Sequence, residues 1–552
     1  MDPHSLRLLR VFCAFGTLAA FCVEAAAWAG DPPALYPYLI EANRAQVVML
    51  AERELLPHDQ LRRIAGALKT AATEPAAPGV QRSPNYLALE ARLVELIGPE
   101  ASNIHVGRSR NDLGETMNRM WLRDQVLRIA EALFSVRSTL QKVAGAHLET
   151  VMPGFTQAVQ AQPTTVAHFL LALDSSLERD GQRLRELYKR INRSPLGSGA
   201  FTTSGFPLDR VRLADLLAFD GLIENSYDAI MVSAADSKVE FSMVIGLSAI
   251  NIGRFAQSLV FQYDDPSAGM VLDGPITTHS SAMPQKRNPS ALERLRLGAS
   301  EVLANAHASA MFSHNTPMYE VKDVREDHLI RLIRFADEAV AMFESLKAVL
   351  ESLTIRRDVL RNLVDGDYST MSELADTLLR QANVPFRTGY KVASELTTYG
   401  KAKGKKTAEL TLQEVSEIFH RLTGAAFPLS EAQLRQAFDP AALIANRKGR
   451  GGPQPAETAR MLRVQQQDVA QARLWVQGCR KASQNASWRL QRSFDALVRW
   501  CVEALLGQGL GGVAGDDLPD CMSQQPAVRA KATKPARASG LDIRMRIRIL
   551  EA

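Results

Sequence analysis

Apolar residues recur three and four positions apart along most of the chain, which is the spacing of one face of an α-helix. This pattern predicts helices over about 113–148, 163–192, 289–313 and 324–353, none with a proline after its first residue. The segment 240–262 is apolar nearly all round, which at this length indicates a helix buried inside a bundle. No stretch of comparable length alternates apolar and polar residues. We therefore predict an all-α fold with very long central helices and minimal strand content.

Composition sets limits on the class of protein. The chain has 552 residues, of which 46% are hydrophobic and 6% aromatic, so it can bury a large core in two or three domains or in one elongated fold. The formal net charge of +5 is small for this length, so bulk charge does not indicate a nucleic-acid partner. No apolar run of about 18 residues indicates a membrane span. Function must therefore be inferred from local sites.

Cysteine and histidine are placed unfavourably for metal or disulfide chemistry. The cysteines lie at positions 13, 22, 479, 501 and 521, so the body of the chain offers no disulfide framework and no thiolate nucleophile. The ten histidines are scattered and lack spaced carboxylate partners, and His168 is expected to be a hydrogen-bonded core or interface residue. No Gly-rich loop follows a strand as a dinucleotide fingerprint requires. We expect no metal and no cofactor.

Residues 1–29 have the layout of a secretory signal peptide. Arg7 and Arg10 precede the apolar run VFCAFGTLAAFCV, and small residues at Ala27 and Ala29 match a cleavage site. The alternatives are a mis-chosen start or an ordinary N-terminal helix. We expect a periplasmic or secreted protein if this segment is a signal peptide, and a cytoplasmic one otherwise.

The C-terminal part changes character. After the turn GRGGPQP at Gly449, one more helix over about 455–477 is expected to complete the body. In the remaining tail, 479–552, the stretch SWRLQRSFDALVRWCVEALL is compatible with an amphipathic helix, whereas SQQPAVRAKATKPARASG is basic and poor in apolar residues, which favours disorder. The tail is expected to be solvated, with a membrane or nucleic-acid contact as the alternative.

Candidate chemistry gathers in four polar or Gly-rich segments. The first, HVGRSRND at 105–112, presents Arg108, Ser109, Arg110 and Asn111 just before a helix, where guanidinium groups and helix N–H groups can hold carboxylates. An ordinary capped helix start with solvated arginines explains the segment equally well.

Two further segments provide turns and close backbone approach. MPGFTQAVQAQPTT, from 152, sets a Pro-Gly turn ahead of Thr156 and Gln157. SPLGSGAFTTSGFPLDR, from 194, is a Gly-rich connector whose small residues let helices or backbone come close together. Neither segment is diagnostic alone.

The fourth segment, THSSAMPQKRNPSALE at 278–293, has flanks typical of a mobile loop and gathers Ser280, Ser281, Lys286 and Asn288. Such a loop can remove a proton from a carbon next to a carboxylate and hold the resulting dianion. Serine is a weak base, so it requires desolvation, backbone donors and a nearby cation, which Lys286 supplies. Asn288 can donate to a carboxylate oxygen. A polar turn capping the next helix would account for Ser and Asn but less well for Lys and Met-Pro.

These four segments together resemble the argininosuccinate lyase family of the fumarase/aspartase superfamily. RSRND, PLGSGA followed by FPLDR, and SSAMPQKRNP look like the family's signatures in the family's order, and the similarity runs from about 35 to 478. The resemblance implies a three-domain fold whose long helices form a 20-helix core in a homotetramer, with each active site shared by three chains. It divides the chain into 30–112, 113–363 with the catalytic loop, 364–478, and a tail outside the family.

The resemblance also implies an activity: anti elimination of fumarate from an N-substituted aspartate, without a cofactor. Ser280 would be the base, while Lys286 and Asn288 would hold the developing aci-carboxylate. The residues expected to contact substrate are Ser109, Arg110, Asn111, Thr156, Ser281, Met283, Asn288 and Arg325. The expected partners are a small dicarboxylate substrate and identical chains, with no nucleic acid.

Departures from the family pattern bear on the substrate. Gln157 stands where the family has a histidine in an acid or relay role, and Glu293, which resembles that histidine's carboxylate partner, remains. Glutamine cannot donate a proton and recover it near neutral pH. A leaving nitrogen that arrives protonated would reduce the need for this group. Further changes at the expected substrate contacts are Asn43, Gln46, His279, Glu320, Arg325 and His328, and such changes can alter discrimination between analogues.

Several functions remain open at this stage. Argininosuccinate and another N-substituted aspartate, of the kind that an ethylenediamine-disuccinate lyase handles, are close alternatives. Adenylosuccinate lyase-like activity is a further possibility, because its loop often takes the SSAMPxKRNP form. A catalytically inactive lyase fold acting as a binding or structural oligomer is the alternative from a different class.

Overall fold

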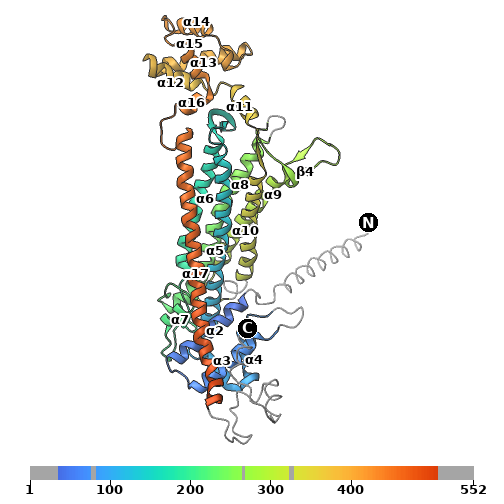
Figure 1. Cartoon of the computed structure of the whole chain (residues 1–552), viewed down its shortest axis with the longest axis vertical. Helices are drawn as coiled ribbons and strands as arrows, with labels where there is room; N and C mark the ends of the chain where they lie inside the picture. The colour runs from blue at the N-terminus through green and yellow to red at the C-terminus, as the bar shows by residue number, and fades with distance from the viewer. Residues whose placement is uncertain (1–34, 76–81, 264–267, 322–327, 508–552) are drawn as a thin grey trace, which may run out of the picture.

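The structure is a computed structural model that describes residues 35–75, 82–263, 268–321 and 328–507. Long helices run side by side through the middle of the molecule as a rod, with a group of shorter helices at each end (Figure 1). The expected signal segment 1–29, the predicted substrate contact Arg325 and the last 45 residues of the chain, from 508 on, lie outside the described residues.

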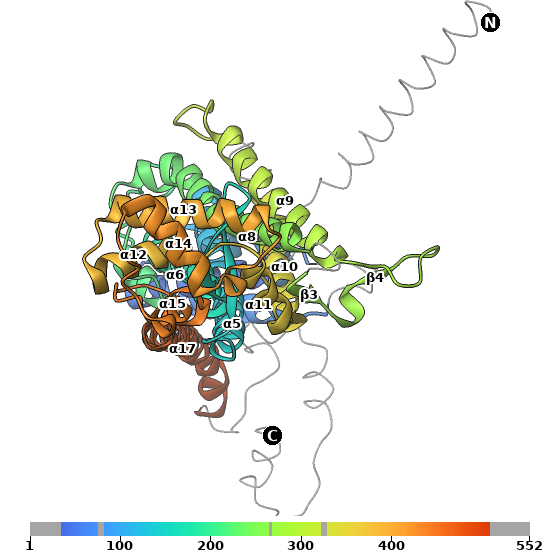
Figure 2. The same cartoon turned by 90° about the horizontal axis from the view of Figure 1, so that it is seen from above.

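The rod is a helical bundle with one continuous apolar core. The predicted helices are confirmed, and all-α is the correct fold class. Side chains such as Leu133, Phe134, Phe241 and Phe343 are at most 1% exposed. Seen from above, the C-terminal domain lies over the end of the bundle (Figure 2). The members are α5 (Arg110–Gly145), α6 (Val166–Ile191), α8 (Ser233–Gln262), α9 (Ser290–Ser313), α10 (His328–Glu351) and α17 (Pro455–Gly507).

The strands of the described residues form three short antiparallel pairs, which agrees with the expected minimal strand content. Two of these pairs carry predicted site segments, β1 with β2 and β4 with β5. The pairs are β1 (Val151–Thr156) with β2 (Val159–Thr165), β3 (Met270–Leu272) with β6 (Leu353–Ile355), and β4 (Thr278–His279) with β5 (Arg287–Asn288).

A second core belongs to the N-terminal end of the rod. Its helices are α2 (Tyr36–Glu52), α3 (His58–Thr73), α4 (Tyr86–Ile97), η2 (Pro99–His105) and α7 (Arg210–Leu216). Leu196, Leu213 and Phe219 pack into this core although they were expected in the central domain. The Gly-rich connector therefore belongs physically to the N-terminal end.

The helix expected to end near 477 does not end there. α17 continues without a break to Gly507, because its apolar residues keep the three-and-four spacing. Leu490 and Phe494 are 1% and 0% exposed and complete the N-terminal core. The expected boundary at 478 was therefore wrong, and residues 479–499 are part of the folded body.

The C-terminal domain has its own small core at the other end of the rod. Leu374, Leu396, Phe419 and Leu434 are buried there, away from the bundle core. The domain comprises α11 (Arg357–Asp365), α12 (Met371–Ala382), α13 (Phe386–Ala402), η6 (Thr407–Glu409), α14 (Leu412–Thr423), α15 (Glu431–Phe438) and α16 (Pro440–Ala445).

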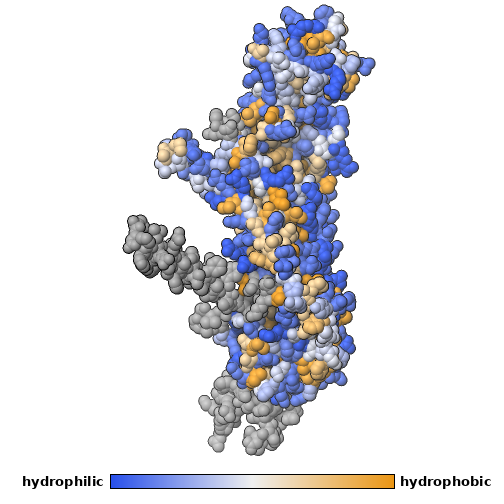
Figure 3. Space-filling view, turned by 180° about the vertical axis from the view of Figure 1, so that it is seen from behind, coloured by the Kyte–Doolittle hydropathy of each residue, from blue (hydrophilic) through white to orange (hydrophobic). Residues whose placement is uncertain are grey.

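α8 keeps an apolar face on the surface. It is entered through a π-helix, η3 (Asp228–Val232), and the span 228–262 is long and apolar enough to cross a membrane by length and composition alone, with 44% of its most apolar part buried. Its buried residues pack inside the bundle, whereas Met243, Leu247 and Ile250 are 37–41% exposed. Figure 3 shows apolar surface along the middle of the rod.

Candidate active site

Asp112 lies where two of the predicted segments meet. Its carboxylate is fully buried and accepts four backbone N–H groups. Oδ1 accepts from Ser109 (2.8 Å) and Leu113 (2.9 Å), and Oδ2 accepts from Gly197 (2.9 Å) and Gly199 (3.0 Å). Burial raises the pKa of this carboxyl to about 6, against the lowering effect of the donors. One carboxylate thus holds the start of α5 against the Gly-rich connector.

The glycines of the connector are needed for this contact. Gly197 and Gly199 adopt φ values of +83° and +64°. A Cβ atom on Gly199 would lie 2.7 Å from the carbonyl oxygen of Thr203, and one on Gly197 would lie 2.7 Å from Cγ of Arg210. Close backbone approach was predicted from the small residues, and the structure confirms it.

The RSRND segment forms the first turn of α5. Ser109 is its N-cap, with an Oγ that accepts from the N–H of Asn111 (3.3 Å), and with Asp112 it completes a capping box. Ser109 and Asn111 are half-buried and Arg110 is exposed. These three side chains therefore lie together at one end of the bundle, beside a helix N-terminus that favours anions.

A carboxylate from a distant segment reaches this turn. Nδ2 of Asn111 donates to Oε2 of Glu320 at 2.6 Å. The backbone before Glu320 is fixed, because the hydroxyl of Tyr227 donates to the carbonyl of Met318 at 2.7 Å. Tyr227 also packs edge-on against Phe201 of the connector, with ring centroids 5.4 Å apart. The sequence signalled a changed residue at 320 but not this contact.

Arg108 is buried rather than presented to a ligand. It donates to Oδ1 of Asn43 and to Nδ1 of His105 (3.3 Å), and lies 5.1 Å from the ring centroid of Tyr86. Burial lowers the pKa of Arg108, and burial with the nearby arginines lowers the pKa of His105 to about 4. Gln46 donates to the carbonyl of Val106 at 3.0 Å. Asn43 and Gln46 thus hold the 105–112 segment through hydrogen bonds to Arg108 and Val106.

A buried polar cluster not foreseen from the sequence lies one turn further along α5. Nζ of Lys238 donates to Oε2 of Glu115 at 3.2 Å, and Arg119 lies 3.6 Å from the other carboxylate oxygen. His328 is 1% exposed and is hydrogen-bonded through Nε2 to the hydroxyl of Ser309 at 2.6 Å. Burial lowers the pKa of His328 to about 3, and Lys238 adds to the effect. His328 is therefore neutral in the folded protein.

Thr156 and Gln157 lie at the tip of the β1–β2 hairpin. Gln157 and Ala158 form its two-residue turn, with φ values of +53° and +61°, which are those of a type I′ turn. Thr156 and Gln157 are exposed. Gln160 anchors the hairpin to the C-terminal domain by donating to Oγ of Ser369 at 2.7 Å. A Gln-Ala turn gives no usual hairpin signal, so the strands were not predicted.

The predicted catalytic loop is the tip of the β4–β5 hairpin, which projects from the side of the bundle (Figures 1 and 2). Oγ of Ser280 accepts from the N–H groups of Ala282 (3.3 Å) and Met283 (3.0 Å). Two such donors stabilise an alkoxide and so make the serine more acidic. Ser281, Met283 and Lys286 are exposed.

The remaining loop residues follow the hairpin into α9. Asn288 is half-buried, with Nδ2 3.5 Å from the hydroxyl of Thr278. Glu293 is exposed in the first turn of α9. His168, expected to be hydrogen-bonded, contacts the hydroxyl of Thr164 (2.9 Å) and the carbonyl of Gly451 (3.0 Å), which confirms that expectation.

The predicted site residues fall into two groups at opposite ends of the bundle. α5 has 36 residues, so its ends are about 54 Å apart at 1.5 Å per residue. Ser109, Arg110 and Asn111 begin α5, whereas the β1–β2 hairpin follows its end. α8 starts beside the first turns of α5, where Lys238 contacts Glu115, and leads to the loop at the far end. One chain alone cannot bring the two groups together.

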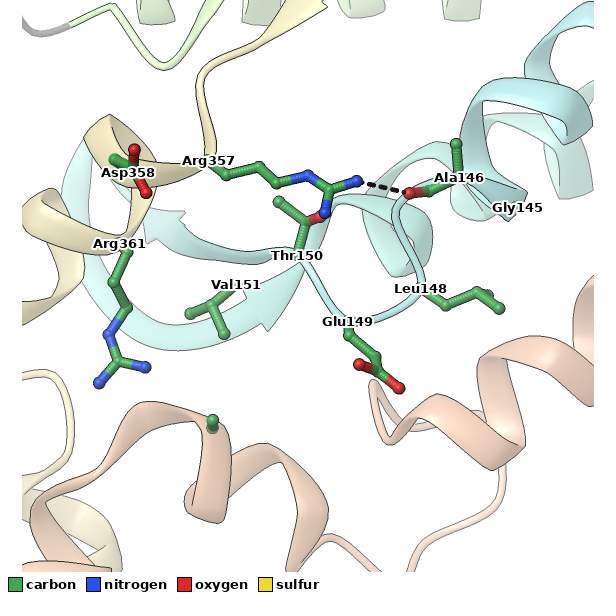
Figure 4. A pocket seen from close by; sticks show the side chains of 10 residues that line it. Gly145, Ala146, Leu148, Glu149, Thr150, Val151, Arg357, Asp358 and Arg361 are labelled. Carbon is green, nitrogen blue, oxygen red and sulfur yellow. Dashed lines mark hydrogen bonds between the residues drawn. The ribbon is translucent and has the colours of Figure 1, made fainter.

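One cavity among the described residues contains none of the predicted site residues. It has a volume of about 550 Å³ and lies between the end of α5, α11 and α16 (Figure 4). Arg357 donates to the carbonyl of Ala146 at 3.0 Å, and Arg361 pairs with Asp365 and Asp439. Arg357 therefore joins the bundle to the C-terminal domain, whereas Arg361 links α11 to the start of α16 within that domain.

Comparison with known sequences yields two family models and a group of relatives. Residues 51–304 match the model described as lyase, and residues 368–445 match the model described as argininosuccinate lyase C-terminal. The argininosuccinate lyase of Methanococcoides burtonii is 32% identical over 440 residues, which are 78% of this chain and 87% of the relative. That of Geobacillus sp. is 32% identical over 429 residues, covering 77% of this chain and 90% of the relative.

Solved structures give the same fold. An EDDS lyase variant with bound fumarate superposes with a TM-score of 0.78 and 31% identity, covering 86% of this chain and 94% of its own. The class II fumarase of Schistosoma mansoni has a TM-score of 0.60 and 14% identity, covering 75% and 91%, so its likeness concerns the fold alone.

Proposed function

This chain belongs to the argininosuccinate lyase family, and from that premise we propose how its residues perform the reaction. The protein is a carbon–nitrogen lyase that eliminates fumarate from an N-substituted aspartate. The observation that carries the residue assignment is the hairpin of 278–288, in which the hydroxyl of Ser280 accepts two backbone N–H groups close to Lys286.

The reaction starts at Ser280. Its alkoxide takes the proton from the carbon next to a substrate carboxylate, and the electron pair of that C–H bond moves into the carboxylate as an aci-dianion. Lys286 and Asn288 hold this charge. The pair then forms the C=C bond of fumarate while the C–N bond breaks and its electrons go to the leaving nitrogen. Ser109, Arg110, Asn111 and Thr156 bind the succinyl carboxylates.

The complete site requires several chains. The two groups of site residues lie at opposite ends of the bundle, about 54 Å apart along α5. The loop of one chain can therefore meet the α5 start of another only if neighbouring chains run antiparallel. The exposed apolar face of α8 supplies a surface for such contacts. We assign the protein as a homotetramer with active sites shared by three chains, as its family resemblance implies.

Gln157 restricts the leaving group. It cannot supply a proton near neutral pH, so the nitrogen must leave as a group that is already protonated in the substrate, such as a guanidinium or a secondary ammonium. Both argininosuccinate and an ethylenediamine-disuccinate-type amino-polycarboxylate meet this condition. Adenylosuccinate has a weakly basic nitrogen and is therefore disfavoured.

Ultraviolet detection of fumarate release tests the proposal. The purified protein without residues 1–29 is mixed with argininosuccinate, ethylenediamine-disuccinate and adenylosuccinate. We expect release from one of the first two, loss of release in Ser280→Ala, and full activity in Ser300→Ala, an exposed serine of α9. If the assembled wild-type protein releases no fumarate from any of the three compounds, the result would support an inactive lyase fold that acts as a binding oligomer. Gln157 is the residue that suggests this alternative.

Residues 1–29 are proposed to direct export. An exported enzyme would be separated from arginine synthesis in the cytoplasm and would act on a scavenged substrate, so its location bears on where the substrate comes from. Expression of the full chain with N-terminal sequencing of the mature protein tests this: cleavage after Ala29 supports export, and an intact Met1 in the cytoplasmic fraction contradicts it.

A further inference from the structure

Glu320 reaches the carboxylate-binding turn from a segment 209 positions away in the sequence. Its Oε2 accepts from Nδ2 of Asn111 at 2.6 Å, in the first turn of α5. Ser109 caps the same turn and Arg110 is exposed beside it. The contact shows that this turn accepts a carboxylate, and that the carboxylate now there belongs to the protein.

The position of Glu320 is built into the fold. Two residues earlier, the carbonyl of Met318 accepts from the hydroxyl of Tyr227, and at the start of the segment Thr316 donates through its hydroxyl to the carbonyl of Ser313 at 2.7 Å. Tyr227 packs against Phe201 of the connector that is bound to Asp112. The carboxylate is therefore directed to the turn by its backbone.

Substrate binding must rearrange this contact. Because Asn111 is assigned to a succinyl carboxylate, a ligand carboxylate and Glu320 compete for one amide donor, and like charges at that distance repel. Glu320 must swing off Asn111, but its anchored backbone keeps its charge within a side-chain length of the ligand. A negative charge therefore remains beside the bound succinyl group.

We propose that Glu320 selects the amine half of the substrate by charge: it favours a cationic half such as a guanidinium and disfavours one that carries further carboxylates. This inference rests on the proposed function, and it separates the two remaining substrate classes. Unit charges a few Å apart near a protein surface interact strongly enough to change relative kcat/KM about tenfold. By this reasoning argininosuccinate is the better substrate of the wild-type protein.

The test compares wild type, Glu320→Gln and Glu320→Asp on argininosuccinate and on ethylenediamine-disuccinate. In Glu320→Gln the ratio of the two kcat/KM values should shift about tenfold toward the carboxylate-rich substrate, and inhibition by succinate, which has no amine half, should strengthen several-fold. Glu320→Asp should keep the wild-type preference. Glu301→Gln, an exposed carboxylate on α9, is the matched control and should change neither ratio nor inhibition.

Unchanged substrate ratio and succinate inhibition in Glu320→Gln would overturn the inference while leaving the lyase function intact. Failure of the proposed function looks different, because wild type itself would release no fumarate. In that case calorimetric binding of the same two compounds decides the inference: a tenfold shift in their relative Kd values supports charge selection, and equal shifts overturn it.

Discussion

Replacement of Asp112 tests whether one buried carboxylate holds the substrate-binding turn. In Asp112→Ala four N–H groups, three of them buried and that of Ser109 part-buried, lose their acceptor. Each orphaned donor costs roughly 1–3 kcal/mol, so the gross loss is roughly 4–12 kcal/mol. The mutation also removes a carboxyl whose pKa is raised from 3.8 to about 6, which returns about 3 kcal/mol at pH 7. The net loss of unfolding free energy is therefore roughly 1–9 kcal/mol.

Asp112→Asn separates hydrogen bonding from charge. The amide keeps one oxygen acceptor for two of the N–H groups, so two hydrogen bonds are lost, which costs roughly 2–6 kcal/mol of unfolding free energy. As in Asp112→Ala, removal of the buried charge returns about 3 kcal/mol. We expect Asp112→Ala to be less stable than Asp112→Asn by roughly 2–6 kcal/mol in chemical denaturation. KM should rise more than kcat falls in Asp112→Asn, since the turn binds the succinyl group.

The contribution of Asp112 to the free energy of unfolding depends on pH. A carboxyl with a raised folded pKa stabilises the protein fully below pH 3.8, and this contribution is lost as the pH rises through about 6. Asp59→Ala is the control, because Asp59 also occupies a first helical turn but is exposed, so its loss should cost at most about 1 kcal/mol. Equal stability of Asp112→Ala, Asp59→Ala and wild type would refute the reasoning.

Three further outcomes follow from buried and exposed side chains. Because the pKa of His328 is lowered to about 3, its contribution to the free energy of unfolding is complete above pH 6.5. This contribution falls by up to about 1.4 kcal/mol per pH unit as the pH drops toward 3. In acid denaturation, His328→Gln should flatten this slope, whereas the control His314→Gln, on the surface, should not. Phe494→Ala should lower the free energy of unfolding by about 3–5 kcal/mol, and Trp488→Ala, at a residue that is 59% exposed on the same helix, by under about 1 kcal/mol. Equal denaturation midpoints of the two variants would contradict a core role for residues 479–499. Leu247→Glu should dissociate the oligomer in light scattering, whereas Leu422→Glu in the C-terminal domain should not; an intact oligomer in Leu247→Glu would exclude this face of α8 from the interface.

Much of the fold was predictable because long helices carry a repeated signal. The apolar spacing identified α5, α6, α9 and α10 to within a few residues, and it found the end of α8 but placed its start seven residues too late. The end of α17 was misjudged because the family resemblance runs only to about 478 and the later tail is basic, whereas Leu490 and Phe494 pack into the N-terminal core. That contact joins residues far apart in the sequence, so the local pattern indicated an amphipathic helix but not the core against which it packs.

The site was predictable in its parts but not in its arrangement. Ser280, Lys286 and Asn288 share one hairpin, as their closeness in the sequence suggested. The link from Asp112 to Gly197 and Gly199, and the contact of Asn111 with Glu320, depend on side chains that meet only after folding. The type I′ turn at Gln157 and Ala158 escaped prediction because neither residue commonly adopts a positive φ.

Mixed assembly of two inactive variants tests the central claim most directly, that Ser280 initiates elimination in a site built from several chains. Ser280→Ala and Arg110→Ala, each assembled alone, should release no fumarate. After the two are unfolded together and reassembled in equal amounts, random assortment should restore activity to about one quarter of wild type, because some sites then combine an intact loop with an intact α5 start. Activity in either variant alone, or none in a mixture shown to contain both chains in one oligomer, would contradict the account.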